Sequence, residues 1–280
     1  DEQVIVNKEL TIKSATATKA IVNFTGTPTG KPTLFDVTAN NVTIENLQFD
    51  VDLSKLRSAI IASSAGLDAI TVKDNMIGAY GTPAGSYGDR NAVSVNYGGS
   101  TNYRVATGGV NAVVFTGNTV TGTAPSSYYR SGISLDEGGL TATGNTLTTI
   151  NHDVLLRFAA NGANNISNNI FNGGGVELAD QNAGSGTVTV SGNTFTGAGA
   201  PGTAKLRVKN GEFNVAHVIS TNTFSTFDWG VSLENMRNVT LNGNTFTGDA
   251  ATDRHVVVNT KSISSNSNTI LQVPVDAVMT

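Results

Sequence analysis

Few side chains of this chain are able to do acid–base chemistry, because only 14% of its 280 residues are charged. Asp136, Arg157 and Lys209 each end a short alternating run, and Asp153 stands near the start of the run that Arg157 ends. A polysaccharide lyase needs a cation to neutralise a uronate carboxylate and a base to remove a proton, and these residue types suit both tasks. The four are therefore candidate catalytic residues. The alternative is a ladder of exposed salt bridges, each worth about 0–1 kcal/mol.

The alternating runs also predict which side chains are neighbours. Aligned on their apolar residues, the runs form two outward-facing columns, Ser63, Asn96, Asp136, Arg157, Ala179, Lys209, Glu234 and Asn259 in one, and Ile61, Ser94, Ser134, Leu155, Glu177, Arg207, Ser232 and Val257 in the other. Neighbours in a column would lie ~4.8 Å apart if the runs are adjacent strands. The alignment therefore predicts two pairs between strands, Asp136 with Arg157 and Glu177 with Arg207.

Tyrosine is concentrated in one part of the chain. All six tyrosines lie between residues 80 and 129, interleaved with arginines in the order Tyr80, Tyr87, Arg90, Tyr97, Tyr103, Arg104, Tyr128, Tyr129 and Arg130. Rigid amphipathic rings offer a surface for the apolar faces of sugars, and guanidinium groups can bind the sugar hydroxyls. These residues are the predicted ligand-binding set; the alternative is that the rings only hold long loops against the fold. Trp229 is either a further sugar-stacking ring or a cover for the core.

No metal site or cofactor is predicted. Asp136-Glu137 and Asp50-Val51-Asp52 offer oxygen ligands of the kind that calcium prefers, but no Asp-rich calcium repeat is present, so calcium is an unsupported alternative. The histidines, His152, His217 and His255, are too scattered for a zinc motif. The chain has no cysteine, which removes thiolate sites.

The elements that position these residues are repeats. The unit Gly192-Asn193-Thr194-Phe195-Thr196-Gly197 recurs with changes about every 24 residues, and its asparagines run from Asn75 to Asn268. Each copy follows a short alternating run, and most repeats hold a second one, which is typical of strands with one buried face. Repeats of this length without a helix stack as a parallel β-coil. Stacked asparagines can hydrogen-bond to one another in a ladder. The bend at this place needs a residue in the left-handed backbone conformation, which asparagine adopts at a lower energetic cost than other residues except glycine.

The apolar residue two places after each asparagine is predicted to form a file inside the coil, made of Ile77, Val120, Leu147, Phe171, Phe195, Phe224, Phe246 and Ile270. The arrangement resembles the right-handed parallel β-helix of the pectin-lyase-like superfamily. The resemblance covers nearly the whole chain and implies an all-β solenoid of about nine or ten coils.

The resemblance concerns the fold and carries over no catalytic residue. Polygalacturonases of the superfamily have Asn-Thr-Asp, Asp-Asp, Gly-His-Gly and Arg-Ile-Lys motifs. Here Asn-Thr is followed by Phe, Val, Leu or Ile, and the other three motifs are missing, as is the arginine-containing signature of pectate lyases. A glycosidase would still need two carboxylates roughly 5–9.5 Å apart, for which Asp136 with Asp153 or Glu177 with Asp180 are the candidate pairs.

Composition and length narrow the choice of partners. The net charge is −4 and lysine and arginine form no cluster, so neither nucleic acid nor an anionic membrane is an expected partner. No apolar run reaches the ~18 residues of a membrane span. We expect one domain over residues 1–280, with loop insertions at about 79–110 and 121–131. No capping helix is evident, so we expect a segment of a larger protein whose flanking domains cover the ends.

Long loops on a rigid scaffold are where binding residues usually lie. We therefore expect a secreted or cell-surface module that binds polysaccharide through the tyrosine-rich loops. One alternative is a polysaccharide lyase or glycoside hydrolase that acts on an acidic polysaccharide along the charged columns. Another is a structural spacer or adhesin stalk with no ligand of its own.

Overall fold

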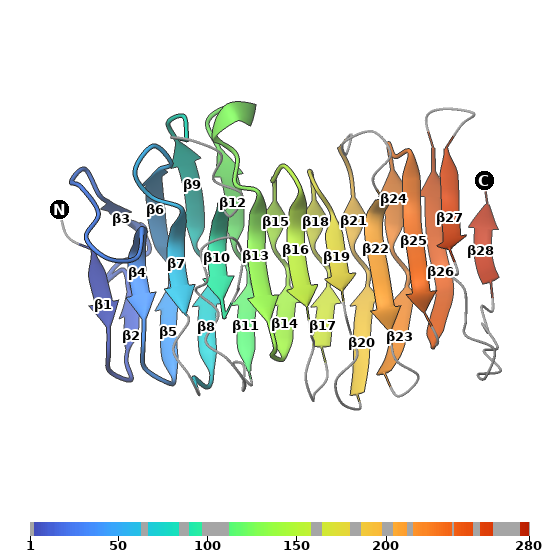
Figure 1. The fold of residues 1–280 in the computed structure, drawn as a ribbon, viewed down its shortest axis with the longest axis horizontal. Coiled ribbons are helices and arrows are strands. Elements are labelled where there is room, and N and C mark those ends of the chain that lie inside the picture. The colour runs from blue at the N-terminus through green and yellow to red at the C-terminus, as the bar shows by residue number, and fades with distance from the viewer. Residues whose placement is uncertain are drawn as a thin grey trace.

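A computed structural model of the chain describes residues 3–62, 67–83, 90–96, 112–157, 164–179, 186–197, 204–211, 215–236, 238–248, 253–259 and 275–279. The protein is a right-handed parallel β-helix, as the repeats predict, and coil follows coil along a rod (Figure 1). The strand pairings in these ranges are parallel. The helical element described in them is one 3-10 turn, η1 (Pro125–Ser127), and no described helix is long and apolar enough to span a membrane.

One side of the rod is a ten-stranded sheet to which each coil contributes one strand. Its strands are β1 (Val4–Val6), β4 (Thr33–Val37), β7 (Ser58–Ala62), β10 (Asn91–Val95), β13 (Ser131–Asp136), β16 (His152–Arg157), β19 (Val176–Ala179), β22 (Ala204–Gly211), β25 (Trp229–Met236) and β27 (Arg254–Asn259). Ten strands agree with the nine or ten coils that the sequence predicts.

The rest of each coil belongs to an eighteen-stranded sheet, which takes up to two strands from a coil. The first strands are β2 (Thr11–Lys13), β5 (Val42–Glu45), β8 (Ile70–Lys73), β11 (Val113–Thr116), β14 (Leu140–Thr143), β17 (Asn164–Ser167), β20 (Gly186–Ser191), β23 (Val215–Ser220), β26 (Val239–Thr247) and β28 (Val275–Met279). The second strands are β3 (Ala20–Asn23), β6 (Leu47–Asp52), β9 (Met76–Tyr80), β12 (Thr119–Gly122), β15 (Thr146–Leu147), β18 (Ile170–Phe171), β21 (Thr194–Phe195) and β24 (Thr223–Ser225). Strand β26 fills both places, because it pairs with β23 and with β24.

Buried asparagines form the predicted ladder between the two strands on this side. Nδ2 of Asn118 donates to Oδ1 of Asn145 at 3.1 Å and to the Val72 carbonyl at 2.9 Å, and the asparagines of the following coils repeat this pattern. The ladder begins at Asn75, and the equivalent place in the preceding coil is taken by Leu47, whose backbone N donates to the Asn75 side chain. The amides thus hydrogen-bond across coils, as buried polar groups require.

The prediction that the ladder asparagine itself adopts the left-handed conformation is wrong. Positive φ occurs at the residue before it, for example at Gly117, Gly144, Gly192, Gly243 and Asn168. Glycine reaches this region without a steric cost, which explains its place before the asparagine in the strongest copies of the repeat. The ladder position therefore selects asparagine for its amide group and not for its backbone.

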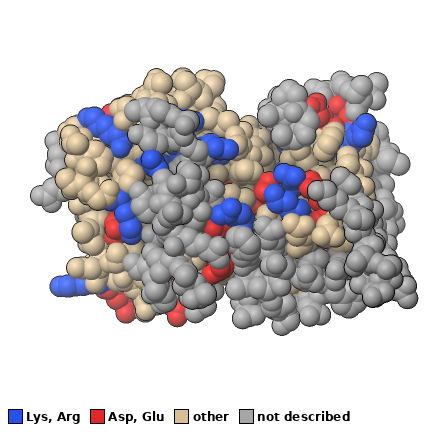
Figure 2. All heavy atoms as spheres, in the orientation of Figure 1, with Lys and Arg blue, Asp and Glu red and all other residues tan. Residues whose placement is uncertain are grey.

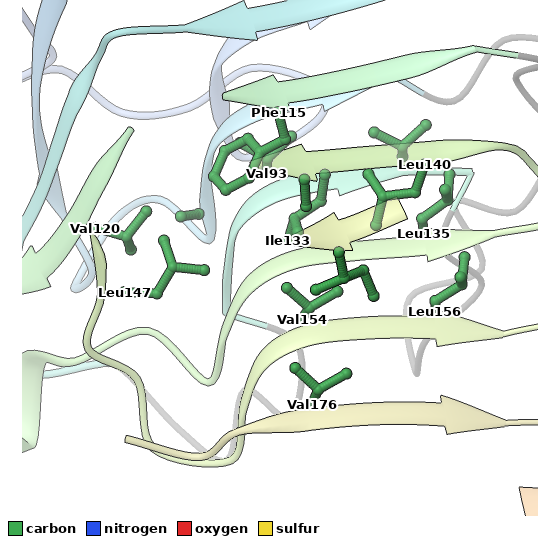
Figure 3. Packing of buried hydrophobic residues seen from close by; sticks show 14 of the residues in the cluster. Val93, Phe115, Val120, Ile133, Leu135, Leu140, Leu147, Val154, Leu156 and Val176 are labelled. Carbon is green, nitrogen blue, oxygen red and sulfur yellow. The ribbon is translucent and has the colours of Figure 1, made fainter. Parts of the chain in front are cut away.

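The interior is filled by files of apolar side chains that run from coil to coil. Every described member of the predicted file after the asparagines is buried. The ring centroids of Phe195 and Phe224 lie 4.6 Å apart, and those of Phe224 and Phe246 lie 4.8 Å apart, with the rings nearly parallel. Ile270 lies outside the described residues. Figure 3 shows the aliphatic residues that fill the interior of the middle coils. These files keep the strands in register, and register positions the outward columns.

Candidate functional site

The strand register of the ten-stranded sheet aligns the described members of the two predicted columns, and Ser63 lies outside the described residues. The strand register pairs Asp136 with Arg157 and Glu177 with Arg207, directly across neighbouring strands. Arg157 donates to Asp136 from Nε at 2.8 Å and from Nη2 at 2.6 Å, and the Asp136 side chain has no exposed surface. Arg207 Nη1 lies 3.4 Å from Glu177 Oε2, so both predicted pairs are confirmed. The guanidinium of Arg157 thus binds both oxygens of the buried Asp136 carboxylate.

Glu177 is the centre of a larger network of charged side chains. Its Oε1 lies 2.8 Å from Lys209 Nζ, and its Oε2 lies 3.4 Å from His152 Nε2 and 3.4 Å from Arg207 Nη1. Burial by itself would raise the pKa of Glu177, but hydrogen bonds from His152 and Lys209 outweigh burial and lower this pKa to about 2. Glu177 is therefore an anion throughout the physiological pH range.

Arg207 connects this network to the next coil. Its Nε lies 2.7 Å from Glu234 Oε1, and its Nη2 lies 2.9 Å from Glu234 Oε2. These hydrogen bonds raise the pKa of Arg207 and lower the pKa of Glu234. Figure 2 shows basic and acidic side chains in contact on this face of the rod. Positive and negative side chains balance within the network, so a ligand would meet both fixed cationic donors and fixed anionic acceptors.

The surface beside the network is hollowed, with a volume of about 290 Å³. The hollow extends over four successive coils and is lined by Ile150, Asn151, His152, Gly174, Val176, Glu177, Ala204, Arg207, Trp229, Ser232 and Glu234. We refer to it below as the Trp229 hollow.

The Trp229 hollow arises because two small residues lie between two rings. By the strand register, His152, Gly174, Ala204 and Trp229 occupy equivalent positions in four successive coils. The row spans three coil rises, or about 14 Å, with a ring at each end and a low floor between them. The floor has no room for a larger residue at its first position, since a Cβ on Gly174 would come within 2.0 Å of the Asn151 carbonyl carbon.

Two buried charged residues support this floor. Asp153 Oδ2 accepts a hydrogen bond from the backbone N of Gly175 at 2.9 Å, and Lys205 Nζ lies 3.5 Å from the Gly173 carbonyl oxygen. The two side chains therefore hold both neighbours of Gly174. Burial raises the pKa of Asp153 to about 7 although the hydrogen bond from Gly175 opposes the rise, and burial lowers the pKa of Lys205.

The groups around the hollow suit binding better than acid catalysis. Hydrolysis of a glycosidic bond needs a carboxylic acid that holds a proton and also reaches the substrate. Glu177 and Glu234 are ion-paired and have lowered pKa values, whereas Asp153 has a raised pKa but no exposed surface. The amine of Lys209 is engaged with Glu177. Among the described residues no three side chains gather that could hold a metal ion.

The predicted tyrosine platform is described only in part. Four of its residues lie outside the described ranges, namely Tyr87, Tyr97, Tyr103 and Arg104, together with most of the predicted insertion at 79–110. Tyr80 ends β9 with 36% of its surface exposed, and Tyr128 is half-buried. Tyr129 is fully buried in the core cluster, and its hydroxyl has no hydrogen-bond partner. Tyr129 therefore has the packing role that the sequence left open.

Two arginines of the predicted set do come together, just before the strands of the ten-stranded sheet begin. Arg90 precedes β10 and Arg130 precedes β13, and the backbone N of Arg130 donates to the Arg90 carbonyl at 2.7 Å. Arg130 lies near the end of the predicted insertion at 121–131, which includes the last two residues of β12, all of η1 and the first residue of β13. None of the described members of the predicted ligand-binding set lines the Trp229 hollow.

Sequence reasoning noticed the two rings of the hollow separately and missed the floor. His152 was considered only among the scattered histidines and Trp229 only as a single ring, because the alternating runs do not extend to the first residue of each strand. Gly174 and Ala204 have no chemistry of their own to draw attention. The available signal was the run Gly173-Gly174-Gly175 directly before a strand, which marks a close approach of two backbones.

No protein-family model matches this sequence, and no curated protein matches it either.

Proposed function

We propose that this protein is a secreted or cell-surface β-helix that binds polysaccharide, and that the Trp229 hollow is its binding site. A sugar ring has apolar CH faces and a rim of hydroxyls. An indole ring binds the apolar CH faces, and hydrogen-bonding side chains bind the hydroxyls, which is the usual composition of a saccharide site. The observation that carries the proposal is that Trp229 and the Glu177–Arg207–Glu234 network line the same hollow.

The network supports binding because its side chains are already fixed. Arg207 is held by Glu234 through two hydrogen bonds, and Glu177 is held by Lys209 and His152. Binding to groups that are ordered in advance loses less conformational entropy than binding to mobile side chains. The ligand-facing polar atoms of the hollow therefore need little rearrangement.

The size of the hollow favours a short stretch of a glycan chain. Its volume of about 290 Å³ lies at the lower end of the roughly 300–1,000 Å³ of ligand pockets. The hollow lies on the outside of a rod and extends along the rod across four coils.

Affinity electrophoresis in gels that contain soluble polysaccharides tests the proposal. A panel of plant, algal and bacterial glycans should include at least one that retards the protein, and Trp229→Ala should abolish the retardation. Tyr80→Ala is the matched control, because it removes an exposed ring from a strand outside the hollow. Retardation that survives Trp229→Ala but is lost in Tyr80→Ala would contradict the proposed site.

A further inference from the structure

Three residues at one corner of the rod form a row that leads into the Trp229 hollow. Arg90, Arg130 and Asn151 directly precede β10, β13 and β16, respectively. The backbone N of Arg130 donates to the Arg90 carbonyl at 2.7 Å, and the backbone N of Asn151 donates to the Arg130 carbonyl at 3.0 Å. The three backbones are therefore stacked in consecutive coils, at the spacing of neighbouring strands.

Neither guanidinium in this row has a carboxylate partner among the described residues. Nε and Nη1 of Arg90 are buried without any hydrogen-bond partner. In the amide orientation that satisfies both groups, Arg130 donates from Nε at 3.1 Å and from Nη2 at 2.8 Å to Asn151 Oδ1, which is a neutral acceptor. The pKa of Arg90 is lowered, first by burial and then by the charge of Arg130.

Two arginines within the strands of this sheet show what is missing here. Arg157 and Arg207 each hold a carboxylate through two hydrogen bonds, to Asp136 and Glu234. A guanidinium with buried N–H groups and a like charge beside it is destabilised until an anion neutralises it. Its planar fork matches the oxygens of carboxylate and sulfate groups. An oxyanion that binds from outside would supply the partner that the described residues do not.

Asn151 connects this pair to the hollow. Its side chain accepts from Arg130, and Asn151 itself lines the hollow next to His152. A glycan chain in the hollow that extends toward the N-terminal end of the rod would pass Asn151 and reach Arg130 and then Arg90. One sugar of such a chain would fill the hollow, and an acidic group on a neighbouring sugar would bind the Arg90–Arg130 pair.

We propose that Arg90 and Arg130 form an anion subsite that binds a carboxylate or sulfate group of the glycan held in the Trp229 hollow. This inference rests on the proposed function, and it names the ligand class as an anionic polysaccharide. The subsite and the hollow use different residues, so they can be tested separately.

Affinity electrophoresis with three probes tests the subsite: polygalacturonate for carboxylate, heparin for sulfate and dextran as a neutral glycan. We expect polygalacturonate or heparin to be bound at least about tenfold more tightly than dextran, since one charge-assisted hydrogen bond contributes about that much. The double variant Arg90→Gln/Arg130→Gln should remove this preference. Lys8→Gln/Lys13→Gln, which loses the same charge at exposed positions of the first coil, should keep it.

The outcomes separate the two proposals. Anionic binding that is equal in the arginine and lysine double variants, or retention by dextran alone, overturns the subsite and leaves the hollow standing. Anionic binding that is lost in the arginine variant but survives Trp229→Ala overturns the hollow and leaves the subsite. Retention by no probe and no panel glycan overturns both. Thermal unfolding checks the fold, because removing two unpaired charges should leave the melting temperature unchanged or raise it.

Discussion

His152 and Trp229 occupy the same register position in coils that are three rises apart, and both line one hollow. The residues between them in this row are Gly174 and Ala204, which are too small to fill the space. The repeat therefore creates the hollow by an interruption in its row of large side chains.

The floor of the hollow should not tolerate a methyl group. Gly174→Ala would place Cβ within 2.0 Å of the Asn151 carbonyl carbon, so the backbones of two coils must move apart. We expect a destabilisation of at least about 2 kcal/mol in urea unfolding and weaker glycan binding. Gly78→Ala is the matched control, since its Cβ would meet its nearest atom at 3.4 Å. Equal stability of the two variants would contradict the described packing of the floor.

The asparagine ladder should contribute strongly to stability. Asn193 donates from Nδ2 to the Ile166 carbonyl at 2.8 Å and to Asn222 Oδ1 at 3.0 Å, and its Oδ1 accepts from Asn169. Asn193→Ala leaves several buried polar groups unsatisfied, at about 1–3 kcal/mol each. We expect a clear drop in the midpoint of urea unfolding. Asn172→Ala, at an exposed position, should change the unfolding free energy by only about 0.5 kcal/mol.

A buried histidine should make the protein sensitive to acid. Burial lowers the pKa of His217 to about 4, although hydrogen bonds with the Val215 and Asn238 backbones oppose the shift. The folded state therefore resists protonation, whereas the unfolded state gains a proton near pH 6.5. The stability that neutral His217 contributes is complete above pH 6.5 and is lost as the pH falls toward 4, by about 3 kcal/mol.

Urea unfolding at several pH values measures this effect. The variant His217→Leu should lose less stability than the wild type between pH 7 and pH 4. Parallel pH curves for the two proteins would show that His217 is not the group responsible.

The buried carboxyl under the hollow should act in the opposite direction. Burial raises the pKa of Asp153 to about 7, so the folded state keeps a proton that the unfolded state loses near pH 4. Stability from this group is therefore greatest in acid and is lost as the pH rises from about 4 to 7. Relative to wild type, Asp153→Asn should be more stable at pH 8 than at pH 5. A difference that does not change with pH would contradict the raised pKa.

The pattern of the sequence was enough to predict the coil and its charged columns. Alignment of the alternating runs placed Asp136 opposite Arg157 and Glu177 opposite Arg207, because a period of two leaves only one register with a buried face. The ladder was predictable for a similar reason, since an asparagine at the same position of every coil lies next to the equivalent asparagines of the neighbouring coils. The conformation of the bend was misassigned because Gly-Asn places two residues with left-handed preference side by side.

The site was harder to predict because it depends on what is absent from a row. Gly174 and Ala204 matter through the space they leave, and no property of either residue indicates this without the register. The burial of Tyr129 was equally hidden, since a tyrosine in a polar segment can face the core or the solvent. Charge pairing is also a three-dimensional property, because Arg157 meets Asp136 of the preceding coil whereas Arg90 has no carboxylate partner among the described residues.

The intrinsic fluorescence of the protein is a direct test of whether a glycan occupies the hollow beside Trp229. Trp229 is the only tryptophan of the chain, so its emission reports on this one place. Titration with a polysaccharide that retards the protein in gels should shift the emission to shorter wavelength and saturate, because the ligand removes water from the indole. Unchanged emission at saturating concentrations of that polysaccharide would contradict the claim.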